Sequence, residues 1–203
     1  MRHTRPLLES EVSTDPLEQF GAWFAQAAAA LEQPEAAALA TASEEGRPSV
    51  RMVLVKSWSQ QGFVFYSNYE SRKGKELAAN PYGALAFYWA PLGRQVRLEG
   101  PVSKLDPAAS DAYFATRPLG ARVSAAVSRQ SQPVASREAL QSAARALLSQ
   151  ASGDHGPSRP PWWGGYVLRP ETYEFWQHRE DRLHDRLAYR HDGGAWRIQR
   201  LQP

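Results

Sequence analysis

The strongest structural signal in the sequence is a pair of strands joined by a tight turn. Residues 49–58 are mostly β-branched and apolar, broken by Arg51 and Lys56, and residues 63–67 continue the pattern after a Gln61-Gly62 turn. Such a hairpin pairs its two strands in an antiparallel arrangement. Similar patterns predict further strands at 37–41, 82–89, 94–105, 163–168, 172–177, 182–190 and 195–201.

Helices are expected between these strands. Asp15, Ser71 and Asp106 are suited to cap the starts of three of them, and another starts near Ser136 and runs to about Leu148. Residues 122–132 are polar and rich in hydrogen-bond donors. The pattern predicts a mainly β protein with flanking α-helices (α+β), in which an antiparallel barrel or sandwich carries helices at one side.

The length of 203 residues predicts a single domain spanning 1–203, with residues 1–14 mobile and residues 149–161 a loop rich in Gly, Ser and Pro. The chain has no cysteine, and its five histidines lack metal-ligand spacing, so no metal site is expected. The net charge of +3 without a basic run gives no argument for a nucleic-acid partner. No segment reaches membrane-spanning length, and we expect a soluble cytoplasmic protein.

Cationic residues near the C-terminus form the first candidate site. A strand period through residues 182–189 would place Arg182, His184 and Arg186 on one face, a few residues after the aromatic wall of residues 175–177. A solvated cationic face on an edge strand explains the spacing equally well. The aromatic wall favours a planar, phosphorylated ligand.

Two other features suit an anion. Arg72 and Lys73 lie at a helix start, where cations oppose the helix dipole unless a phosphate binds there; a solvated basic helix start is the alternative. Tyr113 and Arg117 are four residues apart on one helix face, although a plain surface pair has the same spacing. Glycine-rich phosphate loops are missing from the sequence, so side chains and a helix start would have to hold a nucleotide-like cofactor.

Five blocks of residues, in order and in register from about Asp15 to Pro203, resemble the pyridoxine (pyridoxamine) 5'-phosphate oxidase family. They are residues 51–56, residues 65–68 with 71–73, residues 94–96, residues 128–131, and residues 175–177 with 182–186. The resemblance implies an FMN-binding split β-barrel that forms a homodimer, with two FMN sites at the interface.

The resemblance also implies the site residues. The positions that match FMN-binding residues are Arg51, Met52, Val53, Leu54, Val55, Lys56, Tyr66, Ser67, Arg72, Lys73, Gln95, Gln130, Ser131, Trp176 and Arg186. The positions that match substrate-binding residues are Lys56, Tyr113, Arg117, Arg182 and His184, of which Arg182 and His184 also match the catalytic pair.

The reaction implied by the resemblance is the oxidation of pyridoxamine or pyridoxine 5'-phosphate to pyridoxal 5'-phosphate. A hydride leaves the substrate for the flavin, and dioxygen is reduced to hydrogen peroxide. Lys56, Tyr113 and Arg117 would hold the substrate phosphate, while Arg182 and His184 would cover its ring. The protein would supply binding and orientation, and the flavin the redox step.

Three departures from the family pattern fall on the substrate side. Ala121 stands where a serine is usual, His178-Arg179 replaces a frequent glycine pair, and an N-terminal Arg-x-x-Tyr is not recognisable in residues 1–14. A related FMN oxidase of another planar substrate, such as a phenazine precursor, therefore remains an alternative. A protein that binds FMN or pyridoxal phosphate without turnover is the third possibility.

Overall fold

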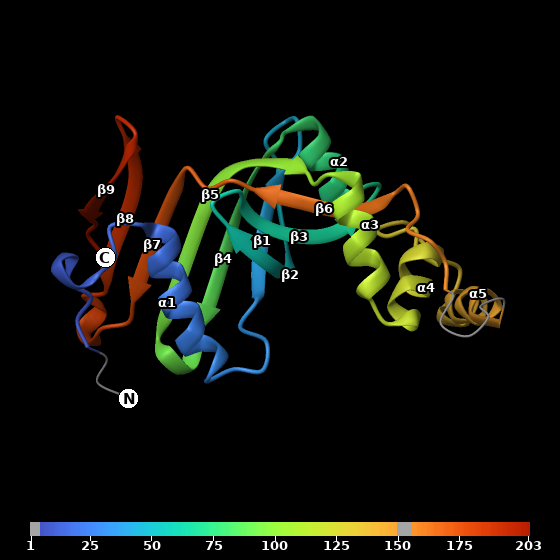
Figure 1. Ribbon diagram of the computed structural model, residues 1–203, viewed down its shortest axis with the longest axis horizontal. Helices are drawn as coiled ribbons and strands as arrows, with labels where there is room; N and C mark the ends of the chain where they lie inside the picture. Colours follow the sequence, from blue (N-terminus) through green and yellow to red (C-terminus); the bar gives the residue numbers. More distant parts are fainter. Residues whose placement is uncertain (1–4, 150–155) are drawn as a thin grey trace.

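The centre of the fold is a closed antiparallel barrel of six strands, seen in a computed structural model that describes residues 5–149 and 156–203. Its strands are β1 (Ala36–Ala42), β2 (Pro48–Ser59), β3 (Gly62–Asn68), β4 (Tyr82–Trp89), β5 (Arg94–Lys104) and β6 (Trp163–Leu168). They are hydrogen-bonded in the order β4-β1-β2-β3-β6-β5, and the pairing of β4 with β5 closes the ring (Figure 1). The predicted mainly β split-barrel class is confirmed.

Strand β5 also starts a second part of the sheet. Its residues 94–99 pair with β7 (Thr172–Gln177), while residues 102–104 turn to pair with β6. Two more strands, β8 (Asp185–Asp192) and β9 (Ala195–Arg200), extend this side and complete a sheet of nine strands. Strands β7 to β9 lie at one end of the molecule in Figure 1.

The α-helices are α1 (Pro16–Ala28), α2 (Arg72–Ala79), α3 (Pro107–Thr116), α4 (Leu119–Val127) and α5 (Arg137–Ser149). Helices α3, α4 and α5 gather at the end opposite to β7–β9 (Figure 1). The expected caps are confirmed, since the side chains of Asp15, Ser71 and Asp106 accept backbone hydrogen bonds at the starts of α1, α2 and α3. In the described part of the chain, every helix is too short or too polar to cross a membrane.

Aromatic side chains fix α1 to the barrel. Phe20 is fully buried and meets Phe63 and Phe87 edge-on, with ring centroids 4.9 and 5.1 Å away. Trp23, one turn further on, packs against Phe175 at 5.3 Å. Burying a large apolar side chain contributes roughly 1.5–3 kcal/mol. These contacts hold the barrel and the β7 side together.

The strand predicted at residues 182–190 begins later than expected. Residues Glu180–Arg182 form a 3-10 turn in which Asp181 and Arg182 have φ values of 55° and 62°, and β8 starts at Asp185. A residue with positive φ cannot continue the pleat of a strand. The prediction that Arg182, His184 and Arg186 share one strand face is therefore wrong, because only Arg186 lies in β8.

Two further segments add to the sequence-based picture. Residues 119–127 form α4, although the sequence analysis assigned no helix there. Residues 5–14, expected to be mobile, contact the C-terminal strands: Leu7 is buried, its N–H donates to Asp185 at 3.2 Å, and Arg200 pairs with Glu9 at 2.8 Å. Residues 1–4 and residues 150–155 of the predicted loop lie outside the described residues.

Candidate functional site

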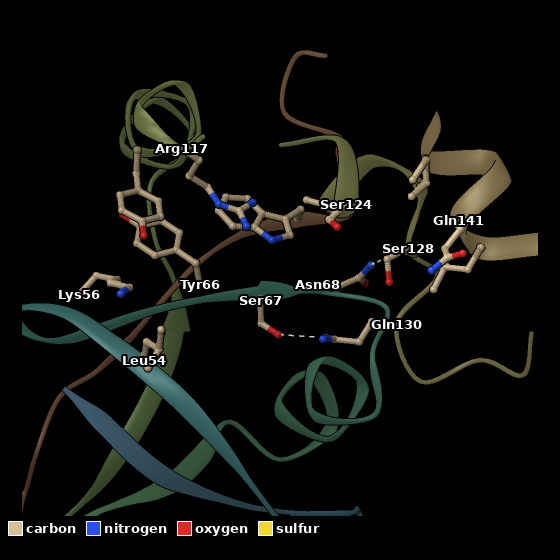
Figure 2. Close-up of a pocket in the computed structure, with 16 residues that line it drawn as sticks. Leu54, Lys56, Tyr66, Ser67, Asn68, Arg117, Ser124, Ser128, Gln130 and Gln141 are labelled. Carbon is tan, nitrogen blue, oxygen red and sulfur yellow. Dashed lines mark hydrogen bonds between the residues drawn. The ribbon is translucent and has the colours of Figure 1, made fainter. Parts of the chain in front are cut away.

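A cavity of about 560 Å³ lies between the barrel wall and helices α3, α4 and α5 (Figure 2). It gathers six predicted site residues from β2, β3, α3 and the position directly after α3, together with Gln130 from the segment after α4. Those predicted residues are Leu54, Lys56, Tyr66, Ser67, Tyr113 and Arg117. Helices α4 and α5 contribute Ser124, Leu140 and Gln141, which the sequence analysis did not predict.

Stacked aromatic rings form one wall of this first cavity. The rings of Tyr66 and Tyr113 lie 3.8 Å apart at an interplanar angle of 14°, and Trp163 of β6 stacks on Tyr66 at 5.4 Å. Burial, and then the neighbouring Tyr113, raise the pKa of Tyr66. The wall therefore presents neutral, flat surfaces at ordinary pH, suited to a planar ligand.

Arg117 is a cation of the first cavity with one buried hydrogen-bond donor that is not used in the described part of the chain. It follows α3, and its guanidinium lies 4.6 Å from the ring centre of Trp163. Its Nη1 atom is buried and has no hydrogen-bond partner among the described residues. Burial lowers the pKa of Arg117. A buried guanidinium with an unused donor is costly unless an anion completes it.

A second cavity, of about 420 Å³, adjoins the first through Gln130, which lines both. Besides Gln130, it brings together five predicted site residues from β2, the start of α2 and the segment after α4. They are Arg51, Met52, Arg72, Lys73 and Ser131. This grouping of three cations, a hydroxyl and a helix N-terminus has the chemistry of a phosphate site.

Lys73 is the most perturbed cation of the second cavity. It is only 7% exposed, and its Nζ donates to Gln130 Oε1 at 2.9 Å, Ser67 Oγ at 3.1 Å and Ser71 Oγ at 3.3 Å. Burial, and then the charge of Arg51, lower the pKa of Lys73 to about 8, although Glu76 acts in the opposite direction. The ammonium group is thus charged at neutral pH and within reach of titration.

The remaining predicted residues lie on the β7–β8 side of the sheet. Gln95, Trp176 and Arg186 occupy one row across β5, β7 and β8, because Gln95 pairs with Trp176 and Trp176 with Arg186. Arg186 is held by both carboxylate oxygens of Glu174, at 2.9 and 3.0 Å. The row is therefore a preformed surface, and none of its three residues lines either cavity.

Arg182 and His184 lie in the turn before β8 and also outside both cavities. The His184 ring is 4.6 Å from Trp176, and its Nδ1 accepts the backbone N–H of Arg179 at 3.1 Å. Burial, then His178 and then Arg182, lower the pKa of His184. A neutral His184 with Nδ1 as acceptor carries its proton on Nε2, where it can donate to a ligand.

The structure thus divides the predicted residues into two groups. One group lines the adjoining cavities, and the other lies beside β7 and β8. Val53 and Val55 belong to neither, because Val55 is buried in the core and Val53 packs against it. Helical spacing could have revealed one residue that the sequence analysis missed: Glu76 lies four residues after Arg72 and pairs with it at 2.9 Å.

An exposed apolar surface lies on the outer side of the sheet. Val50, Met52 and Leu54 alternate along β2 with exposed fractions of 68%, 64% and 37%, and Tyr88 of β4 is 61% exposed. Tyr88 pairs with Gln95, so this surface continues into the row of Gln95, Trp176 and Arg186. Large apolar side chains gathered on one face mark an interaction surface.

Two family models match this chain. Residues 24–151 match the family model of pyridoxamine 5'-phosphate oxidase, and residues 163–203 match the C-terminal dimerisation region of pyridoxine 5'-phosphate oxidase. The two matches together cover most of the chain, and the C-terminal one is to a dimerisation region.

Individual relatives extend over nearly the whole chain. The pyridoxine/pyridoxamine 5'-phosphate oxidase of Paraburkholderia phymatum is 54% identical over 96% of this chain and 92% of its own length. The pyridoxine/pyridoxamine 5'-phosphate oxidase of Rubrobacter xylanophilus is 52% identical over 97% of this chain and 91% of its own length. Among solved structures, the fold is similar to that of PhzG from Burkholderia lata 383 in complex with tetrahydrophenazine-1-carboxylic acid, with a TM-score of 0.91. The two sequences are 33% identical, and the match covers 100% of both chains. This chain therefore belongs to the pyridoxamine 5'-phosphate oxidase family.

Proposed function

We propose that this protein oxidises pyridoxamine or pyridoxine 5'-phosphate to pyridoxal 5'-phosphate with dioxygen as the electron acceptor. The observation that carries the proposal is the pair of adjoining cationic cavities, one containing Arg117 with its unused buried donor. Two phosphate-bearing molecules, a cofactor and a substrate, would use both. Two relatives that are more than half identical are pyridoxine/pyridoxamine 5'-phosphate oxidases, which supports the same conclusion.

The flavin expected from family membership is FMN. The residues of the second cavity suit a terminal phosphate, since Arg72, Lys73 and Ser131 surround the start of α2. When bound, FMN would supply the redox chemistry, in which a hydride from the substrate reduces dioxygen to hydrogen peroxide. The remaining candidates for holding it are Arg51 to Lys56 along β2, and Tyr66, Ser67 and Gln130.

Residues of the first cavity would bind the substrate phosphate. Lys56, 3.4 Å from Glu35, and Arg117 provide charge, and Tyr113 provides a hydroxyl. Ala121 does not line this cavity, but Ser124, three residues later on α4, does. Residues three apart share a helix face, so Ser124 is placed to supply the hydroxyl that position 121 lacks.

A second copy of the chain would complete the site. Gln95, Trp176 and Arg186 would reach FMN across the interface, and Arg182 and His184 would cover the substrate ring there. Support comes from their place outside both cavities, from the exposed apolar surface that continues into their row, and from the dimerisation region. The assembly would be a homodimer with two sites, each drawing on both chains.

The organisation of the whole chain belongs to the same proposal. We expect residues 1–203 to unfold as one unit, because Leu7 packs in the core that also contains Phe175 and Tyr189. The absence of cysteine fits a reducing, cytoplasmic location.

Alkaline pH should weaken FMN binding through Lys73. The ammonium group is charged below its pKa of about 8 and pairs with the phosphate, which is a dianion above about pH 6. As the pH rises above 8, the free protein loses this charge, and FMN affinity should fall by up to about tenfold per pH unit.

Fluorescence titration of the apoprotein between pH 7 and 9.5 measures this change. Riboflavin, which lacks the phosphate, should bind with little pH dependence, and Lys73→Met should remove the FMN dependence. An FMN affinity that stays constant across this range would show that Lys73 does not act on the phosphate.

Peroxide release by the purified holoprotein tests the function itself. Pyridoxamine 5'-phosphate should give one peroxide per pyridoxal 5'-phosphate formed. A phenazine-type oxidase is the second candidate, favoured by Ala121 and by the likeness to PhzG. If tetrahydrophenazine-1-carboxylic acid is oxidised and pyridoxamine 5'-phosphate is not, the second candidate replaces the first.

A further inference from the structure

A buried carboxylate lies behind the cations of the second cavity. Glu76 of α2 is 7% exposed and does not line the cavity among the described residues. Its Oε2 accepts hydrogen bonds from Thr41 at 2.5 Å, Ser49 at 2.6 Å and Arg51 at 3.2 Å, and its Oε1 accepts from Arg72 Nε at 2.9 Å. Both oxygens are thus used, and two of the donors are cations that line the cavity.

The charge of Glu76 is maintained over the whole working range of pH. Burial would raise the pKa of Glu76, but hydrogen bonds from Ser49, Thr41 and Arg72 outweigh it and lower the pKa to about 2. Arg51, Arg72 and Lys73 would otherwise repel one another, as the effect of Arg51 on Lys73 shows. With Glu76 present, the group carries two net positive charges, which matches a phosphate monoester dianion.

The two arginines are held in different ways. Arg51 also donates to Leu39 O at 3.0 Å and to Thr41 at 2.6 Å, so most of its N–H groups are committed within the protein. Arg72 uses Nε for Glu76, and its two Nη groups have no hydrogen-bond partner among the described residues. Glu76 therefore fixes one edge of the Arg72 guanidinium and leaves the other edge available to the cavity.

We propose that Glu76 is a positioning residue for phosphate recognition, because it fixes the Arg72 guanidinium beside Lys73 and ties it to Arg51. The proposal rests on the proposed binding of FMN in the second cavity. Arg72 comes from α2 and Arg51 from β2, and Glu76 is the carboxylate that joins them. A long, 62% exposed arginine side chain would otherwise lose conformational entropy on binding the phosphate.

The test compares FMN with riboflavin on the apoprotein by fluorescence titration. The dissociation constant of riboflavin divided by that of FMN measures how much the phosphate adds to affinity. In Glu76→Ala this ratio should fall at least about tenfold, with riboflavin affinity nearly unchanged. The control Glu44→Gln, which removes an exposed carboxylate in the β1–β2 turn, should leave the ratio as in the parent protein.

A second variant separates positioning from folding. Glu76→Gln keeps one acceptor oxygen for Thr41, Ser49 and Arg51 but turns an amide N–H₂ toward Arg72, so it too should lower the ratio. In an Arg72→Ala background, Glu76→Gln should have no further effect. A ratio that is unchanged or higher in both Glu76 variants would overturn the proposal, as would equal weakening of FMN and riboflavin, which indicates damage to the fold. Failure of the parent to discriminate between FMN and riboflavin would instead refute the FMN site itself.

Discussion

Replacing Arg117 with alanine should lower kcat/KM for pyridoxamine 5'-phosphate by about 10- to 100-fold while FMN stays bound. A hydrogen bond to a charged group contributes about 1.5–3 kcal/mol, and each 1.4 kcal/mol is tenfold. Arg117 is held over Trp163 with a buried Nη1 that lacks a partner among the described residues, so the guanidinium is in place before the phosphate arrives. Its loss removes a preorganised contact rather than a mobile one.

Steady-state peroxide assays, with flavin content measured by absorbance, test this result. Arg117→Lys should recover only part of the loss, since an ammonium group lacks the planar fork of donors. Arg145→Ala, which removes an exposed arginine from α5, is the matched control and should behave like the parent protein. If kcat/KM of the Arg117→Ala enzyme for pyridoxamine 5'-phosphate stays within threefold of the parent value, Arg117 does not bind the substrate phosphate.

Replacing Tyr88 with aspartate should dissociate the dimer and release FMN. Tyr88 lies on the exposed apolar face beside Gln95 but lines neither cavity, so the substitution acts on the interface and not on the flavin site of its own chain. Buried tyrosines are frequent interface hot spots that contribute about 2–4 kcal/mol, and a desolvated aspartate adds a further penalty. The dimer dissociation constant should rise about 100-fold or more.

Light scattering and flavin fluorescence over a protein dilution series measure both effects. Loss of the dimer and loss of FMN should occur at the same protein concentration, because binding and association are linked. The control Leu148→Asp, at another exposed apolar residue on α5, should stay dimeric. A monomeric Tyr88→Asp protein that still retains FMN would show that one chain forms the flavin site alone.

The strands and most helix starts could be predicted from the sequence because their signals are local. The alternation in β2 and the capping side chains of Asp15, Ser71 and Asp106 depend on neighbours within a few residues. The turn at Asp181 and Arg182 could not be predicted in this way. A polar-apolar alternation is compatible with two residues at positive φ, and only the pairing of Asp185 with Gln177 shows where β8 begins.

The candidate site was predictable only as a set of residue types. Arg72 with Lys73 and Tyr113 with Arg117 each indicated an anion from their spacing. Their division into adjoining cavities depends on the closure of the barrel and on α4, whose sequence gave no clear helical signal. The spacing of Glu76 from Arg72 indicates only an ordinary ion pair on a helix, and its contacts with Thr41 and Ser49 depend on the fold, so its role could not be predicted from the sequence.

A hybrid dimer provides the most direct test of the central claim, that each oxidase site combines the cavities of one chain with Arg182 of the other. Arg117→Ala and Arg182→Ala chains, carrying different affinity tags, would be co-expressed and the mixed dimer isolated. One of its two sites then has both arginines, so it should oxidise pyridoxamine 5'-phosphate at about half the rate of the parent dimer. Each single-variant dimer should be nearly inactive. A mixed dimer that binds FMN yet is as inactive as both single-variant dimers would contradict the account.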